Sequence, residues 1–434
     1  MLTVLLRGSA LAGGLLIVGG LAGVWLQPTL RGAWSLLGSG QEEGVELLPA
    51  LVSALFEAGS FDRAEEVADL AVSASASLGL GRVHARAAVE RERIRLARRP
   101  ETFRVQDAVV VAERAAQALR GFGDELGLAR AAYLMSDLSW LQGDVVSSSA
   151  HGERMLTHAR RAGSGFDAAT ALSYLGWDLV EGPCPAPEAI ARCDALAREA
   201  AGLRAAELSL LGCRAALLAM TDGYAEARGS MARARTGLAE LHLREMAAYL
   251  AHLDAFAELL AGDPAAAERA TLDAEAIVAE SGDRWFLSNL SIDLALAILA
   301  QGRHADAAAV AERIEAVPAP CDRQWVIKRH AVRALLASQR GDQEEGLREA
   351  RAAVAAAEGT SLVVFCANAH RTLAEVLLAA GRDEEAVAAA GRALALDQAK
   401  GNAVAAAATR RRFFASSPAG RRAPAPRRRR RGRG

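Results

Sequence analysis

The chain has 434 residues, of which 52% are apolar but only 5% aromatic, so Ala, Leu and Val supply most of its apolar mass. Ala and Leu are strong helix formers, and the β-branched and aromatic runs typical of strands are missing, which favours an all-α protein. The net charge of −1 combines an acidic body with a basic end. Without residues 410–434, which hold eleven Arg, 40 basic and 52 acidic residues remain, a net charge of −12.

An uncharged apolar segment, GSALAGGLLIVGGLAGVWL, occupies residues 8–26. Its 19 residues approach the length of a membrane-spanning helix. Three interpretations stay open: a transmembrane helix, a cleaved signal peptide, and a misassigned start that never inserts. We therefore predict that residues 1–42 form this segment and a linker, and that the rest is a cytoplasmic array, with residues 8–26 as its candidate membrane anchor.

From residue 43 onward a turn signal returns about every 40 residues. The predicted turn residues are Gly59, Gly143, Asp222, Gly262, Gly302, Gly341 and Gly381. Two wider gaps each fit two periods, with irregular turns near Arg99–Pro100 and Gly182–Pro183. Further turns at 121–127, 163–165, 282–283, 359–360 and 401–402 divide the units into two antiparallel helices. A fixed period in this range is typical of a solenoid, whose units bury their apolar faces by stacking.

Small residues form columns at fixed offsets from these turns. Seven residues before the turn stand Val52, Ser136, Ala215, Ala255, Ala295, Ala334 and Ala374. Five residues after it stand Ala64, Ser148, Ala227, Ala267, Ala307, Gly346 and Ala386. Such columns indicate that two consecutive helices cross closely. A turn Gly ends the first helix, and acidic residues after it, such as Asp263 and Asp342, complement the N-terminus of the next.

These columns around a Gly turn resemble the tetratricopeptide repeat (TPR), here stretched from about 34 residues and without its closing Pro. The resemblance implies a right-handed TPR-like α-solenoid of about nine helix hairpins over residues 43–414. Segments such as LLPALVSALFEAGSFDRAEE and LLAGDPAAAERA also resemble the C-terminal region of actinobacterial proteins that carry a class III adenylate/guanylate cyclase domain and an AAA ATPase. Large LuxR-type transcriptional regulators have similar repeats.

The catalytic parts of those relatives have no counterpart here. A phosphate-binding loop needs Lys followed by Ser or Thr, but the only two Lys residues, Lys328 and Lys400, precede Arg329 and Gly401. Neither a cyclase domain nor a helix-turn-helix module fits beside the repeats. The five Cys residues fit no metal-ligand spacing and are interpreted as free thiols. We therefore predict a non-enzyme without a catalytic, cofactor or metal site.

A protein-binding groove is the site that the repeat pattern favours. In TPR-like arrays the first helix of each unit lines the concave face, and positions 13, 10 and 6 before the turn lie opposite the small column. Polar and aromatic residues at this spacing form one stripe, suited to peptide capture; the alternative is an ordinary solvated face. The predicted groove residues are Arg130, Tyr133, Asp137, Tyr249, His252, Phe256, Asn289, Lys328, Asn368, Arg371 and Glu375.

We predict a regulatory protein-binding or scaffolding array that holds a protein or peptide on its concave face and has no small-molecule substrate. One alternative is a regulatory fragment of a nucleotide cyclase/AAA ATPase or of a LuxR-type regulator. Another is an array recruited to nucleic acid or anionic membrane by its basic tail. That tail, residues 415–434, is predicted to be disordered, and its Arg residues to bind phosphates without sequence specificity.

Overall fold

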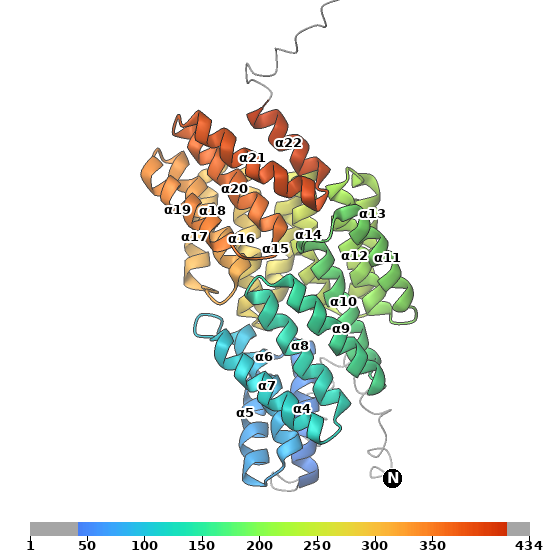
Figure 1. Cartoon of the computed structure of the whole chain (residues 1–434). Helices are drawn as coiled ribbons and strands as arrows, with labels where there is room; N and C mark the ends of the chain where they lie inside the picture. The colour runs from blue at the N-terminus through green and yellow to red at the C-terminus, as the bar shows by residue number, and fades with distance from the viewer. Residues whose placement is uncertain (1–41, 415–434) are drawn as a thin grey trace, which may run out of the picture.

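The structure, a computed structural model, describes residues 42–414, which form nineteen α-helices and no strand (Figure 1). Consecutive helices pair into nine hairpins, α4–α5 to α20–α21, and α22 follows, so the predicted all-α array is confirmed. The helices are α4 (Glu42–Glu57), α5 (Phe61–Ser77), α6 (Gly81–Arg98), α7 (Val105–Gly121), α8 (Glu125–Leu141), α9 (Val145–Arg161), α10 (Gly165–Glu181), α11 (Ala186–Glu199), α12 (Arg204–Met220), α13 (Tyr224–Glu240), α14 (Arg244–Ala261), α15 (Pro264–Ser281), α16 (Arg284–Ala300), α17 (His304–Ala316), α18 (Arg323–Gln339), α19 (Gln343–Ala357), α20 (Val363–Ala379), α21 (Asp383–Lys400) and α22 (Ala403–Phe413).

Two predicted segments lie outside the described residues: the apolar segment 8–26 and the Arg-rich tail 415–434. Among the helices of residues 42–414, none combines the length and the apolar character that a membrane crossing requires.

Left-handed residues end the helices where the sequence predicts turns. All seven predicted turn residues have positive φ, from 66° at Gly59 to 83° at Gly341. Glycine adopts this conformation without a steric penalty, and Asp222 takes the same role with φ of 70°. After two of these turns, Asp263 and Asp342 accept hydrogen bonds from the backbone N–H groups three residues on, which caps α15 and α19. The predicted irregular turns are the connections α6–α7 and α10–α11.

The small-residue columns lie at the helix crossings. Every residue of the column seven positions before the turn is at most 1% exposed. Ala255 of α14 packs with Ala267 of α15 and Ala297 of α16 in one apolar cluster. Where Ser replaces Ala in both columns, the Ser136 hydroxyl donates a 3.1 Å hydrogen bond to the carbonyl oxygen of Ser148. Small side chains at these points allow the backbones to approach at the density of a protein interior.

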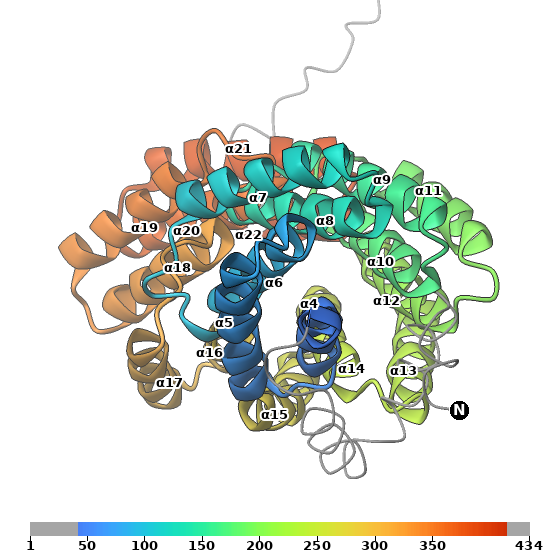
Figure 2. The ribbon, with the colours of Figure 1, turned by 90° about the horizontal axis from the view of Figure 1, so that it is seen from below.

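The hairpins curve around a common axis, with even-numbered helices on the inner side and odd-numbered helices on the outer side (Figure 2). After ten helices the chain meets itself, because α16 packs beside α6, α20 beside α10 and α22 beside α12. One turn of the superhelix therefore takes five hairpins. The second turn lies against the first, which brings together inner side chains that are far apart in the sequence.

Polar contacts join the two turns of the superhelix. The N–H of Val145, at the start of α9, donates to the Ser361 hydroxyl at 2.7 Å, and the N–H of Ser361 donates to the carbonyl oxygen of Gly143 at 2.8 Å. Further along, Lys400 at the end of α21 donates to three backbone carbonyls at the end of α10, the nearest being Leu179 at 2.7 Å. These contacts hold the turns in register.

Candidate partner-binding surfaces

The predicted groove residues all lie on even-numbered helices, which line the inner side of the superhelix (Figure 2). Arg130, Tyr133, His252, Asn289 and Lys328 are buried. Asn368 is exposed, and the remaining five are half-buried. The inner face therefore has a buried part, where the predicted residues contact one another and the rest of the chain, and a more accessible part.

Arg130 and Tyr133 of α8 belong to a cluster around the buried Arg93 of α6. The Arg93 guanidinium lies between two rings, 4.0 Å from the centroid of Tyr133 and 4.5 Å from that of Phe56 in α4. Such cation–π contacts are strong when the cation is shielded from water. The Tyr133 hydroxyl is 2.9 Å from the hydroxyl of Tyr174 in α10. Helices α4, α6, α8 and α10 thus meet at one cationic and aromatic cluster.

Carboxyl groups surround this cluster. Glu57 lies 3.9 Å from Arg93. Burial raises the pKa of Asp137, one helical turn after Tyr133, to about 7, although Arg93 offsets part of the rise. Burial also raises the pKa of Asp178 on α10 to about 8, and the carboxyl groups of Glu181 and Asp137 add to that rise. In both carboxyls burial therefore outweighs the neighbouring groups that stabilise the ionised form.

His252 of α14 is the centre of a second buried network. Its Nδ1 is 2.5 Å from Oδ2 of Asp293, to whose other oxygen Lys328 donates at 3.0 Å, and its Nε2 is 3.3 Å from Glu181. The Trp177 ring stacks on the imidazole at 6.0 Å. Burial lowers the pKa of His252, but the charge and hydrogen bond of Asp293 and the hydrogen bond to Glu181 together more than offset this, and the pKa rises to about 9. The imidazolium therefore predominates at neutral pH and links α10, α14, α16 and α18.

Glu245 and Tyr249, also on α14, extend the polar face toward the start of α16. The Tyr249 hydroxyl donates to Oδ2 of Asp283 at 2.9 Å. Burial, followed by the nearby carboxyl groups of Glu57 and Asp283, raises the pKa of Glu245 to about 7. The Glu245 carboxylate packs against the α4–α5 turn, since a Cβ at Gly59 would collide with it. This contact joins α4 to α14.

The remaining predicted residues are engaged locally. Asn289 of α16 donates from Nδ2 to the N-cap carboxylate of α18 at 3.0 Å. On α20, Arg371 donates to the side-chain oxygen of Asn368, and Glu375 pairs with Arg412 of α22 at 2.9 Å. The structure therefore separates these residues from the networks around Arg93 and His252.

Sequence reasoning missed Trp177, Asp178 and Glu181 on α10. This helix ends at Gly182 with φ of −80°, not with a left-handed residue, so the turn signal gave no register here. The 40-residue period alone could have located these residues. It places the next turn at position 183, 40 residues after Gly143, and Trp177 lies six residues before that position. That offset is the one occupied by Asp137 and Phe256 in their units.

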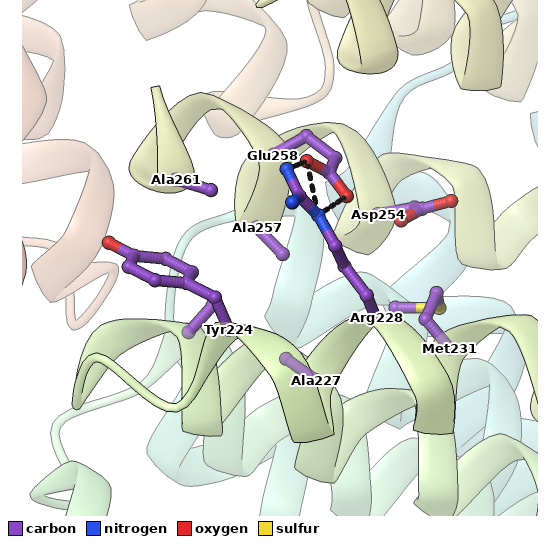
Figure 3. A pocket seen from close by; sticks show the side chains of 9 residues that line it. Tyr224, Ala227, Arg228, Met231, Asp254, Ala257, Glu258 and Ala261 are labelled. Carbon is purple, nitrogen blue, oxygen red and sulfur yellow. Dashed lines mark hydrogen bonds and ion pairs between the residues drawn. The ribbon is translucent and has the colours of Figure 1, made fainter. Parts of the chain in front are cut away.

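The outer side carries an open groove of about 560 Å³ between α13, α14 and α15. Figure 3 shows the small pocket that continues it, lined by Tyr224, Met231 and several Ala residues. Arg228 of α13 reaches across this pocket to Glu258 of α14, with an Nη2–Oε2 distance of 2.5 Å. The charges lining the groove are balanced, since Arg235 pairs with Asp254 in the same way at 2.8 Å.

The described residues contain no group of three or more His, Cys, Asp or Glu side chains arranged to hold a metal ion. The five cysteines are free thiols. Burial raises the pKa of Cys193 and of Cys321 to about 12, which keeps both protonated and unreactive at neutral pH.

Comparison with known proteins supports the fold. No protein-family model matches the sequence, and no curated protein matches it. Among solved structures, the chain is similar to one described as "Crystal structure of APC/C hetero-tetramer Cut9-Hcn1", with a TM-score of 0.54, 15% identity, and coverage of 88% of this chain and 74% of that chain. It also matches the TPR domain of P58(IPK), with a TM-score of 0.23, 15% identity and coverage of 85% and 97%. A circular tandem repeat protein matches with a TM-score of 0.20, 16% identity and coverage of 93% of each chain. The first similarity places the chain in the class of TPR-like α-solenoids, as the repeat columns predict.

Proposed function

We propose that this chain is a protein-interaction scaffold that holds a segment of a partner protein on the inner face of its superhelix. The observation that carries this proposal is the gathering of half-buried polar and aromatic side chains from several repeats on that face, among them Asp137, Tyr174, Trp177 and Tyr249. Aromatic rings supply contact area, and the polar groups beside them orient a bound chain.

Two further points support the proposal. The similar structure with a TM-score of 0.54 is described as a hetero-tetramer, so an array of this fold can assemble with another chain. The resemblance to the repeat regions of cyclase–ATPase proteins supports a regulatory role for such binding.

Site-specific photo-crosslinking tests where a partner binds. A p-benzoylphenylalanine residue would replace Asn368 or Phe256 on inner helices, or Leu272 or Phe122 on the outer side, where these two side chains are 45% and 56% exposed. The full-length chain would be irradiated in native lysate and the products identified by mass spectrometry. We expect one partner to be captured from the inner positions only. Capture of that partner from the outer positions alone would contradict the proposal.

A further inference from the structure

Five carboxyl groups follow one continuous path on the inner face, and we name them the inner acidic strip: Glu57, Asp137, Asp178, Glu181 and Glu245. The path begins where Glu245 packs against the α4–α5 turn at Gly59 and passes to Glu57, two residues before that turn. Glu57 lies 3.9 Å from Arg93, and the Arg93 guanidinium packs on the ring of Tyr133. Asp137 lies one helical turn after Tyr133 on α8. Asp178 and Glu181 continue the path on α10, where the buried Asp178 accepts hydrogen bonds from the hydroxyls of Ser148 and Ser149 on α9.

Basic groups contact only part of this strip: Glu181 pairs with His252 at 3.3 Å, and Glu57 lies 3.9 Å from Arg93. Within residues 42–414, no basic side chain lies within 4.0 Å of Asp137, Asp178 or Glu245. Glu57 shares Arg93 with Glu90, which is closer at 3.0 Å. Asp137 and Glu245 therefore have no cation in direct contact.

Glu181 gives a second, independent indication of a missing ligand. Its side chain is buried, and Oε1 lies 3.3 Å from His252, but Oε2 has no hydrogen-bond partner among the described residues. A buried carboxylate oxygen without a donor is costly and rare in folded proteins. This one oxygen of the strip therefore lacks a donor, whereas Asp178 accepts from the hydroxyls of Ser148 and Ser149.

Aromatic rings accompany the strip, and part of it is open to water. Glu57, Asp137 and Glu245 are only half-buried, so a ligand can reach them. Tyr174 lies one helical turn before Asp178, and Tyr249 lies one turn after Glu245. The faces of such rings attract cations, Arg guanidinium groups in particular.

We propose that the inner acidic strip binds a basic segment of a partner protein, placing its Arg or Lys side chains against Asp137 and Glu245. The ligand class follows from charge complementarity, because Arg or Lys side chains supply the positive charge that is missing beside Asp137 and Glu245. Phosphate groups of nucleic acid or lipid are repelled by the same carboxylates. This inference rests on the proposed function and names the chemistry of the partner.

Proton linkage agrees with this assignment. Burial raises the pKa of Asp137 and of Glu245 to about 7 and that of Asp178 to about 8, so these groups are partly protonated at neutral pH. A bound cation favours the ionised form and lowers the pKa of each group. Binding of a basic segment at pH 7 should therefore release protons.

The test measures binding of a fluorescein-labelled nine-residue peptide of alternating Arg and Ala to the full-length chain, by fluorescence anisotropy at low salt. A peptide with Gln in place of Arg is the neutral control. We expect the double variant Asp137→Asn/Glu245→Gln to weaken binding at least tenfold. The matched variant Asp383→Asn/Glu384→Gln removes two exposed carboxylates at the start of α21 and should change the Kd less than twofold. Equal effects of the two double variants would overturn the proposal.

The basic tail of the chain itself requires a further variant. Its eight Arg residues between 415 and 434 would be replaced by Gln, and the peptide titration repeated. Failure of both the full-length chain and this variant to bind the peptide overturns the proposal. Binding that appears only after the replacement makes the chain's own tail the occupant and overturns the partner assignment.

Isothermal titration calorimetry at pH 7 in phosphate and in Tris measures the protons released on binding. A purely structural role of Asp137 and Glu245 would not change this proton release. The apparent binding enthalpy should differ between the buffers for the unmodified chain, and the difference should shrink in the Asp137→Asn/Glu245→Gln variant. If this variant crosslinks a partner on its inner face as efficiently as the unmodified chain does, the scaffold function stands. The inference that the partner segment is basic would then be wrong.

Discussion

Lys400 donates a 2.7 Å hydrogen bond from Nζ to the carbonyl oxygen of Leu179, 221 residues earlier in the chain. The carbonyl oxygens of Gly182 and Cys184 accept from the same ammonium at 2.8 Å each. These carbonyls lie at the end of α10, where helical partners run out, so Lys400 caps that helix from the other turn of the superhelix. An ammonium with three tetrahedral donors fits such a tripod and a planar guanidinium does not, which accounts for a Lys in a chain with 49 Arg.

Replacement of Lys400 should loosen the contact between the superhelical turns. Lys400→Met leaves three buried carbonyl acceptors without a donor, at a cost of about 3 kcal/mol in unfolding free energy. Lys400→Arg should not restore the loss, because its donors lie in one plane. Hydrogen exchange followed by mass spectrometry should quicken around residues 179–184, whereas the exposed Arg410→Met on α22 should leave exchange there unchanged. Unaltered exchange in Lys400→Met would show that the cap does not hold the turns together.

His252 should make stability depend on pH between about 6.5 and 9. Its folded-state pKa of about 9 exceeds the unfolded value of about 6.5, so the folded chain binds more protons in this window. Its stabilisation is complete below pH 6.5 and is lost as the pH rises through 9. His252→Gln should reduce this decline by up to about 3 kcal/mol. Urea unfolding at pH 6, 7.5 and 9 measures the loss of stability with rising pH, and His304→Gln serves as the control. If the loss is as large in His252→Gln as in the unmodified chain, His252 is not its source.

Asp137→Asn should stabilise the chain at alkaline pH. Burial raises the folded-state pKa of Asp137 to about 7, above the unfolded value of about 3.9, so ionisation destabilises the folded state as the pH rises through 7. The amide cannot ionise, and we expect a gain of about 2 kcal/mol at pH 8 and little change at pH 3. Thermal unfolding at both pH values measures the difference. Destabilisation at pH 8 would show that Arg93 already compensates this carboxylate fully.

A pair of glycine variants tests the contact between α4 and α14. Gly59 and Gly79 have similar φ values, 66° and 68°, so an Ala at either position incurs a backbone cost of about 1–2 kcal/mol. At Gly59 the new Cβ also meets Glu245 and Ser281, whereas at Gly79 no atom lies within 4 Å. Gly59→Ala should therefore lose about 1–2 kcal/mol more than Gly79→Ala in chemical denaturation. Equal losses would rule out the close approach of Glu245 to the α4–α5 turn.

A buried Ala at a helix crossing leaves no room for a large side chain. Ala274 of α15 is fully buried against α14 and α16, whereas Ala276, two residues later on the same helix, is exposed. Ala274→Leu should overpack the crossing and lower the free energy of unfolding by about 1–3 kcal/mol. Ala276→Leu should leave the free energy of unfolding close to that of the unmodified chain. Circular dichroism during urea unfolding compares the two. An Ala274→Leu variant as stable as the unmodified chain would mean that the helices separate readily at this crossing.

The sequence by itself determined the repeat unit, because the forces that define it act within one hairpin. The left-handed turn at Gly262, the cap at Asp263 and the small residues Ala255 and Ala267 lie within thirteen residues of one another. Their spacing recurs in each unit and can be read without knowledge of the rest of the chain. The same register predicted that the side chain of His252 lies on the inner side.

Only the tertiary structure decided what those inner side chains meet. The curvature of the array is a sum of small packing angles between hairpins, and no local pattern encodes their total. That total brings α16 beside α6 and α20 beside α10, and it joins groups up to 221 residues apart. The pairing of Lys400 with the end of α10, and the assembly of Glu57, Glu181 and Glu245 into one strip, follow from this closure because such distant contacts leave no period in the sequence.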